Sequence, residues 1–536
     1  MGEGGWLGRL LGGKRQSLRL AAVARDHVEG DRGVGEALGQ GVLLHDGERF
    51  ALQGLDFSTL DLAQPLHRHL HGFSWLRDLA AAAGREQGSR LGEAVVRRWL
   101  HVHGAEPDAA WASDLMGERL LFWLAYAPYI LSSRDEEYRR SLLNAMARAA
   151  RQLGESADKV PPGLPRITAW AGMTAACLCM EGDLPRVARA EAGLMRALGQ
   201  GQHEDGGLIS RRPWEQALLV DRLGLVRAAY FAAKQALPDA LEDAASAALA
   251  ALHGVRMGDG GLASWQGGHP GDPQALNALV EGCGMRARPL RKPRGWGYHR
   301  LSALGTVVQI DAAPPPLPPH APSAHASTLA IEICDGEQRL VMSCGGPGTR
   351  PDRLPPALVA GLRGSDAHSG LVLDGANSTP LDDEGVPKKG IPAIEVERKE
   401  DDHFSRLTAT HDGYLKRFGL MHERKLALSN DGKEVRGEDN LKPEGRRLRR
   451  KTLPFLLRFH IAPDVEVIPT ADGQGALLRP RNAPPWQFRC TGGALSLDQS
   501  LVIAPGARPI NASQLVIAAE AGKEGATVNW QFRRSS

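Results

Sequence analysis

The spacing of apolar residues changes along the chain, and this change divides it into two halves. From residue 108 to residue 237, apolar residues recur every three or four positions, and the helix-favouring residues Ala, Leu, Arg and Glu predominate. The spacing is clearest over residues 108–131, 137–153, 167–200 and 213–237. Prolines and glycines separate these segments, so the pattern predicts successive helical hairpins in a bundle, a solenoid or an α/α toroid.

Beyond residue 297 the spacing shortens to the alternation that is typical of β-strands. Asp-Gly and Asn-Asp-Gly pairs punctuate this half, and they favour hairpin turns because Gly and Asn tolerate positive φ. About ten or more short strands with such turns indicate a large antiparallel sandwich or layered sheet. The predicted strands lie at residues 305–311, 329–336, 338–346, 369–375, 394–401, 405–414, 424–439, 456–463, 465–480, 486–492, 500–506 and 528–534.

The length of 536 residues is too great for one typical core, so we predict a multidomain α + β protein. The predicted parts are an N-terminal extension over 1–60, a helical domain over 61–290 and an antiparallel β domain over 295–536. The longest apolar run, residues 120–131, contains Pro128 and is shorter than the roughly 20 residues that a bilayer requires. No transmembrane segment is therefore predicted.

The overall charge argues against a nucleic-acid partner. The chain has 65 basic and 62 acidic residues, and its formal net charge is only +3. One local run, GRRLRRK at residues 445–451, is strongly basic. It is interpreted as a solvated loop, with docking of an acidic polymer as the alternative. The six cysteines form no CxxC pair, so we expect core residues or free thiols and no zinc knuckle.

Several motifs, taken in their order along the chain, resemble the heparinase II/III family from about Phe73 to Arg534. The motifs are DGGLISRRP at 205–213, GDGGLASWQGG at 258–268, GYHRLSALGTVVQID at 297–311, SAHASTLAIEI at 323–333, VMSCGGPG at 341–348, HDGYLKRFGLMHERKLALS at 411–429 and RFHIAPDVEV at 458–467. The resemblance implies an incomplete α/α toroid followed by a large antiparallel β-sandwich. It also implies a polysaccharide lyase whose cleft binds an acidic polysaccharide or oligosaccharide and cleaves it by β-elimination at a uronic acid.

β-Elimination requires a clamp that neutralises the uronate carboxylate, a base that removes a proton, and an acid that protonates the leaving oxygen. HDGY offers His411 and Tyr414 on either side of a turn, and His325 lies at a predicted strand entrance. SRRP places two arginines before a helix, where the N-terminus adds positive potential. The predicted catalytic residues are Tyr414, His411 and His325, and the predicted substrate-binding residues are Arg211, Arg212, Tyr298, His299, Arg417 and His422.

Each candidate also has a purely structural interpretation. The ring of Tyr414 can pack on the sheet while His411 makes a hydrogen bond in its turn, and the arginines can be solvated at a helix start. His325 can be an ordinary polar residue at a strand entrance.

The sequence departs from the family pattern at several reactive positions. The resemblance implies His-x-His followed by Asp at the entrance of the strand after residue 323, with a metal site that includes more distal ligands. Here His325 fills only the second position, and Ser327 and Ser343 stand where acidic or amide residues are expected. A structural zinc site needs about four N, S or O ligands, so no metal and no cofactor are predicted. Trp214 stands where the family places a Tyr, and Leu208 where it places a His.

Three functions remain open from the sequence. The first is a lyase for an acidic, uronate-containing glycan. The second is a non-catalytic protein that binds acidic glycans or associates with envelope polysaccharide. The third is a glycosidase that uses paired carboxylates among Glu118, Asp205, Glu215 and Asp259. The N-terminal residues show no signal peptide, which favours the cytoplasm, whereas the resemblance favours the bacterial cell envelope or periplasm. No pattern indicates an oligomeric state.

Overall fold

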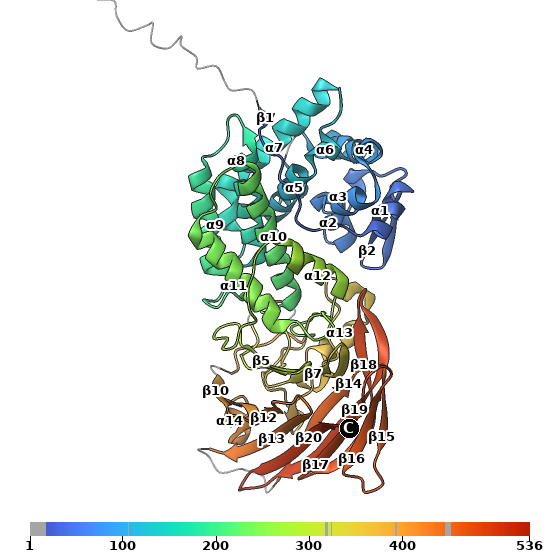
Figure 1. Ribbon diagram of the computed structural model, residues 1–536, viewed down its shortest axis with the longest axis vertical. Coiled ribbons are helices and arrows are strands. Elements are labelled where there is room, and N and C mark those ends of the chain that lie inside the picture. Colours follow the sequence, from blue (N-terminus) through green and yellow to red (C-terminus); the bar gives the residue numbers. More distant parts are fainter. Residues whose placement is uncertain are drawn as a thin grey trace, which may run out of the picture. The chain divides into compact units, whose positions relative to one another are not determined.

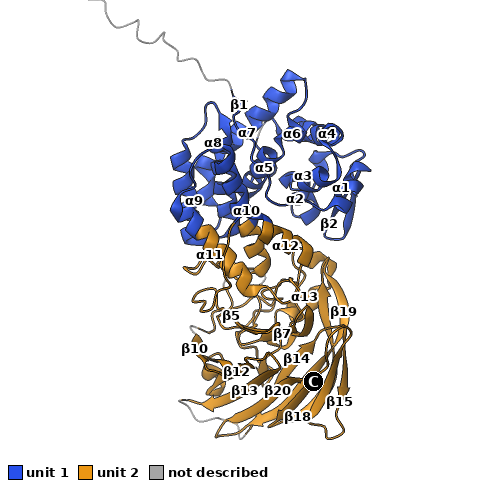
Figure 2. Cartoon of the chain, in the orientation of Figure 1, with its two compact units in different colours: residues 1–201, 221–243, 282–284 blue, residues 202–220, 244–281, 285–536 orange. Residues whose placement is uncertain are grey.

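A computed structural model of the chain describes residues 18–105, 107–316, 320–322, 324–391, 394–444 and 452–535 (Figure 1). The basic run at 445–451 and the first 17 residues lie outside the described residues. The chain forms two compact units, drawn in different colours in Figure 2. Unit 1 comprises residues 1–201, 221–243 and 282–284, and unit 2 comprises residues 202–220, 244–281 and 285–536. The domain boundaries predicted above stay a prediction.

Helices make up most of the N-terminal half, as the three-to-four-residue spacing predicts. They are α1 (Arg32–Gly39), α2 (Pro65–Gly72), α3 (Leu76–Ala82), α4 (Arg85–His103), α5 (Ser113–Ala125), α6 (Ala127–Ile130), α7 (Glu136–Ser156), α8 (Leu164–Cys179), α9 (Val187–Gly201), α10 (Pro213–Ala232), α11 (Asp239–Val255) and α12 (Pro273–Gly282). Short strands accompany them at β1 (Arg19–Leu20), β2 (Val42–His45), β3 (Glu48–Ala51) and β4 (Met180–Glu181). The segment 167–200 is divided between α8 and α9, because EGDLP interrupts the helix between them.

Two glycines allow α5 and α8 to cross closely within unit 1. A Cβ atom on Gly117 would lie 2.3 Å from the Thr168 carbonyl oxygen, and one on Gly172 would lie 2.2 Å from the Gly117 carbonyl oxygen. Both distances are far below van der Waals contact, so a side chain at either position would force the helix backbones apart.

Unit 2 contains two large sheets in which every pairing is antiparallel. The first, called the β10 sheet, has the order β10-β11-β12-β13-β20-β17-β16-β15. The second, called the β18 sheet, has the order β18-β19-β14-β8-β7-β6-β5, and β9 pairs with β14. The strands are β5 (Tyr298–Ala303), β6 (Thr306–Asp311), β7 (Ile331–Asp335), β8 (Gln338–Met342), β9 (Leu371–Leu373), β10 (Ile394–Glu400), β11 (Phe404–His411), β12 (Leu420–Ser429), β13 (Glu434–Pro443), β14 (Leu453–Ile461), β15 (Val465–Pro469), β16 (Gly475–Pro480), β17 (Trp486–Thr491), β18 (Ala494–Ala504), β19 (Arg508–Ala521) and β20 (Ala526–Arg534).

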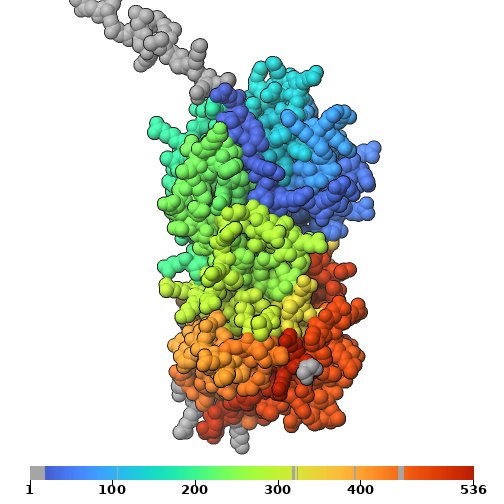
Figure 3. Space-filling view, in the orientation of Figure 1, coloured from blue at the N-terminus to red at the C-terminus, as the bar shows by residue number. Residues whose placement is uncertain are grey.

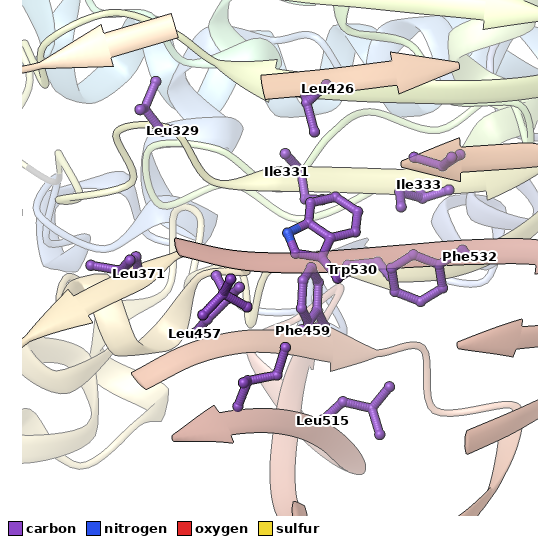
Figure 4. Close-up of a cluster of buried hydrophobic side chains, with 14 of the residues drawn as sticks. Leu329, Ile331, Ile333, Leu371, Leu426, Leu457, Phe459, Leu515, Trp530 and Phe532 are labelled. Carbon is purple, nitrogen blue, oxygen red and sulfur yellow. The ribbon is translucent and has the colours of Figure 1, made fainter. Parts of the chain in front are cut away.

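The core of unit 2 is built from inward-facing apolar side chains of both sheets. Figure 4 shows the Trp530 indole among Ile331 of β7, Phe459 of β14 and Phe532 of β20. The ring centroids of Phe459 and Trp530 lie 4.9 Å apart in an edge-to-face arrangement. Aromatic pairs of this geometry stabilise a core beyond the area that they bury. The C-terminal strands that close over this core form the orange-to-red surface of unit 2 in the space-filling view (Figure 3).

The six cysteines are all buried and free, which confirms the expectation of core thiols. Among the described residues, none of the helices has both the length and the apolar character needed to cross a bilayer. Two small helices complete unit 2, namely α13 (Pro356–Leu362) and α14 (Leu415–Phe418).

Candidate functional site

His325 lies inside unit 2, in the segment that leads into β7, and it faces a second imidazole. Its Nδ1 atom is 3.2 Å from Nε2 of His368, so one ring donates a hydrogen bond to the other. The backbone N–H of His325 donates to Oε1 of Gln266 over 2.8 Å. Burial lowers the pKa of His325 well below its ordinary value, and the pKa of His368 to about 3. Both rings are therefore neutral near pH 7.

Arg211 lies two residues before α10, and its guanidinium is buried rather than open to a ligand. It forms an ion pair with Asp311 at the end of β6, and its Nε donates to the Trp296 carbonyl over 3.0 Å. The Tyr298 hydroxyl donates to the Arg211 carbonyl over 2.6 Å. Arg211 has a φ of +53°, so its backbone is strained. Its charge is already neutralised by a protein carboxylate.

Gln266 and Ser327 join Arg211 to His325 in one continuous set of hydrogen bonds. The Ser327 hydroxyl donates to Oδ2 of Asp311 over 2.6 Å. Nε2 of Gln266 donates to that carboxylate over 3.2 Å and to the Ser327 hydroxyl over 2.9 Å. We call Arg211, Gln266, Asp311, Ser327, His325 and His368 the Asp311 network. Sequence reasoning missed Gln266, Asp311 and His368, which belong to segments far apart in the chain.

A second polar set lies inside the β10 sheet, and the strand register creates it. His411 at the end of β11 pairs with His422 of β12, and Arg424 of β12 pairs with Asp439 of β13. Nδ1 of His411 accepts from the Gly413 N–H over 3.0 Å, so its Nε2 carries the proton and donates to Nδ1 of His422 over 3.2 Å. Nε2 of His422 then donates to Asp439 over 2.8 Å.

Arg424 completes this second set, which we call the Asp439 network. Its Nε and Nη2 donate to the two oxygens of Asp439 over 2.8 and 3.1 Å. Its Nη1 donates to the carbonyls of Leu329 and Ser369 over 2.6 and 3.1 Å. Nε1 of Trp530 donates to Asp439 over 2.8 Å. Although burial opposes ionisation, these cationic and polar neighbours keep the pKa of Asp439 below its ordinary value.

Tyr414 follows the turn after His411, and its ring centroid lies 5.5 Å from that of His411. The side chain is only 1 % exposed, and its hydroxyl donates to the Leu371 carbonyl over 2.8 Å. Burial raises the pKa of Tyr414 above its ordinary value, and it does the same for Tyr298. Neither phenol is thereby favoured as a base, because each would have to ionise in the interior while facing a carbonyl oxygen.

The remaining predicted residues do not join either network through a hydrogen bond that we observe. Arg212 is half-buried and donates to Glu215 over 2.8 Å. His299 is buried, and burial lowers its pKa to about 4. Arg417 is exposed and lies 4.8 Å from the centre of the Phe418 ring. The structure thus groups Arg211, Tyr298 and His325 around one network, and His411, His422 and Tyr414 around the other. Whether any of the nine takes part in catalysis or substrate binding stays a prediction.

The residues around His325 do not fit the zinc ion that the family resemblance implies. His325 and His368 use ring nitrogens on each other, and Ser327 is committed to Asp311. The buried hydroxyl of Ser343 finds no hydrogen-bond partner in the described structure, yet a neutral serine is a poor zinc ligand. Within the described ranges, no three His, Cys, Asp or Glu side chains come together as a metal site would need.

The four carboxylates considered for a glycosidase all have partners of their own. Glu118 accepts from Arg222 over 2.6 Å, and Asp205 accepts from the Arg294 N–H over 2.6 Å. The partners of Glu215 and Asp259 are Arg212 and Arg339, at 2.8 and 2.7 Å. These contacts are accounted for by stabilisation of the fold, so the four carboxylates do not specifically support a glycosidase.

Comparison with known proteins shows which proteins the chain resembles in sequence and in fold. Residues 285–531 match the family described as heparinase II/III-like, C-terminal. The chain is 28% identical over 537 residues to the FtsZ-localized protein C of Caulobacter vibrioides, an alignment that covers 96% of this chain and 90% of the relative. Heparan sulfate lyase HepC from Pedobacter heparinus superposes with a TM-score of 0.62 at 14% identity, covering 94% of this chain and 82% of HepC. A heparinase III structure gives a TM-score of 0.63 at 13% identity, covering 92% and 80%.

At such identities the solved structures establish the fold alone, a helical region followed by antiparallel sheets, as expected from the sequence. The resemblance expected from the sequence is confirmed as well: residues 285–531 of the chain match the heparinase II/III-like C-terminal family.

Proposed function

We propose that this chain is a non-catalytic heparinase-like protein that associates with envelope polysaccharide and localises with FtsZ. One observation carries the first part of the proposal. The Tyr and His side chains that would transfer protons are buried, and their hydrogen bonds go to protein groups, as with Tyr414 on the Leu371 carbonyl. Function depends on the site rather than on the fold, so a lyase fold with such a site need not be a lyase.

The similarity to the FtsZ-localized protein supports the second part. That alignment covers 96% of this chain and 90% of the relative, so it includes both the helical half and the β half. A likeness confined to the shared β domain would support only a common fold. Similarity over nearly the whole of both chains supports a common role, here localisation with FtsZ.

A lyase remains the second candidate, because the fold likeness to heparan sulfate lyase HepC favours it. In that case His411 and Tyr414 would carry proton transfer, and Arg211 would clamp a uronate. Each would first have to exchange its present partner for substrate, and for Arg211 that means leaving Asp311.

Two measurements on the full chain test the proposal. A fluorescent fusion expressed in its own host is expected to follow FtsZ to the division site and to disperse when FtsZ is depleted. Purified protein incubated with heparan sulfate, hyaluronan and other uronate polymers is expected to produce no near-ultraviolet absorbance of an unsaturated uronate. It is also expected to retard an acidic polymer in an affinity gel.

The opposite outcomes are equally specific. Unsaturated product that disappears in Tyr414→Phe, while His325→Ala keeps it, would establish the lyase with HDGY as its reactive centre. Loss in His325→Ala alone would move the chemistry to the Asp311 network. A fusion that spreads evenly whether or not FtsZ is present would refute the localisation.

A further inference from the structure

The two sheets of unit 2 end in four edge strands, and three of them are protected against pairing with another chain. β10 carries five charged residues among its seven, IEVERKE. β15 has only five residues and ends in Pro469. In β5 three of the six residues are buried, and the Arg300 carbonyl accepts from Arg398 over 3.0 Å. Charge, shortness, proline and covering are the usual means by which proteins prevent edge-to-edge association.

The fourth edge, β18, lacks these protections. It has eleven residues, ALSLDQSLVIA, with a single charge at Asp498 and no proline. Its residues 496–499 are exposed, and Leu497 is one of the exposed large apolar side chains at 39 %. Its partner β19 covers one side only.

The hydrogen bond of Ile503 shows which backbone groups face outward. The Ile503 N–H donates to the Cys344 carbonyl over 2.8 Å, away from β19. Backbone groups alternate in direction along a strand, so those of residues 495, 497 and 499 point to the same outer side. The C-terminal end of the edge is covered by the segment at Cys344. Among the described residues, the stretch from Leu495 to Gln499 is therefore open, and its last carbonyl accepts a side-chain bond from Gln514 over 2.9 Å.

We propose that β18 pairs in antiparallel fashion with β18 of a second copy of this chain, with the twofold axis at Leu497. In this register the outward N–H and C=O groups of Leu497 face those of Leu497 in the second copy. The same groups of Leu495 face those of Gln499 in the second copy, and the reverse. Each of these three residue pairs forms two hydrogen bonds, so six backbone hydrogen bonds hold the interface together. A two-copy interface of this kind joins two sheets into one. The proposal is independent of the function proposed above.

The side chains of β18 favour pairing with β18 of a second copy over pairing with an unrelated peptide. In the register centred on Leu497, the exposed leucine of each copy packs beside the other. Asp498, the only charge, lies opposite Ser496 and not opposite another carboxylate. Like charges directly opposite each other destabilise a strand pair, and this arrangement avoids them.

Cysteine crosslinking tests the register directly. Residues opposite each other in a hydrogen-bonded pair have Cα atoms about 5.5 Å apart, within the range that a disulfide spans. The native cysteines are all buried, so Leu497→Cys introduces the accessible thiol. At ~10 micromolar protein, Leu497→Cys is expected to form a covalent dimer on the order of a hundredfold faster than a thiol that meets its copy only by collision. Leu304→Cys, at a turn residue that is 77 % exposed, is the matched control.

The oligomeric state gives a second, independent readout. Light scattering and sedimentation are expected to show a dimer for the natural sequence. Leu497→Pro is expected to be a monomer with an unchanged circular dichroism spectrum, because it removes an outward N–H that β19 does not use. A monomer at tens of micromolar, or equal crosslinking rates for Leu497→Cys and Leu304→Cys, would overturn the proposal. Fast crosslinking of Leu495→Cys alone would overturn the register.

Discussion

Replacing Asp439 with alanine is expected to lower the free energy of unfolding by about 3 to 5 kcal/mol. The carboxylate lies inside the β10 sheet and accepts hydrogen bonds from Arg424, His422 and Trp530. Alanine would leave a buried guanidinium without its counter-charge, and the indole and imidazole N–H groups without acceptors. Urea denaturation, followed by tryptophan fluorescence and circular dichroism, measures the loss.

The neighbouring residue supplies the control. Glu438 lies on the same strand but faces outward, where it pairs with Lys425 at 2.7 Å. An exposed pair of this kind contributes about 0 to 1 kcal/mol, so Glu438→Ala should change stability little. If both variants lost the same free energy, the Asp439 network would have no special role. The double variant Asp439→Leu with Arg424→Met should recover part of the loss, because it removes both charges together.

The Asp439 network also connects to the two histidines of the Asp311 network. Arg424 donates to the carbonyls of Leu329 and Ser369. Leu329 lies four residues after His325, and Ser369 directly follows His368. Leu329 has a φ of +61°, a conformation that leucine rarely adopts unless its surroundings impose it. Arg424 therefore helps to hold both segments in place, and the Asp439 variant should disturb the His325–His368 pair as well.

The periodicity of the sequence predicts most of the fold, and the exceptions have physical reasons. β19 (Arg508–Ala521) was missed because Pro509, Asn511 and its many small residues weaken the strand signal. Pairing with β14 and β18 on its two sides compensates for that weak propensity. The predicted segment at 500–506 likewise forms only the end of the longer strand β18.

The candidate site could be predicted only where its residues are close in sequence. His411 and Tyr414 were identified from HDGY, and their rings do lie together. Arg211 and Asp311 are separated by one hundred positions, so no spacing reveals their ion pair. Alternation in β12 does place Leu420, His422, Arg424 and Leu426 on one face, and polar residues on an otherwise apolar face were the available signal for the Asp439 network.

Acidification from pH 6.5 to pH 5 is expected to remove about 3 kcal/mol of stability through His368 and His460 alone. Burial lowers the pKa of these two imidazoles to about 3 and about 4, whereas in the unfolded chain both titrate near 6.5. Below pH 6.5 the unfolded state therefore binds protons that the folded state does not bind, and the free energy of unfolding falls as the pH falls. Each ring contributes about 1.6 kcal/mol of this loss. His325, His411 and His422, whose pKa values burial also lowers, act in the same direction.

A substitution separates this effect from general acid denaturation. His460 contacts the Ser500 hydroxyl through Nδ1 and the Asp366 carbonyl through Nε2, so His460→Gln keeps a donor for that carbonyl but cannot titrate. Its stability should fall by about 1.6 kcal/mol less than that of the natural sequence between pH 6.5 and 5, whatever its stability at pH 7. His403→Gln, at an exposed turn, is the matched control for the substitution itself. A profile equally steep in all three proteins would mean that the buried imidazoles do not govern the acid response.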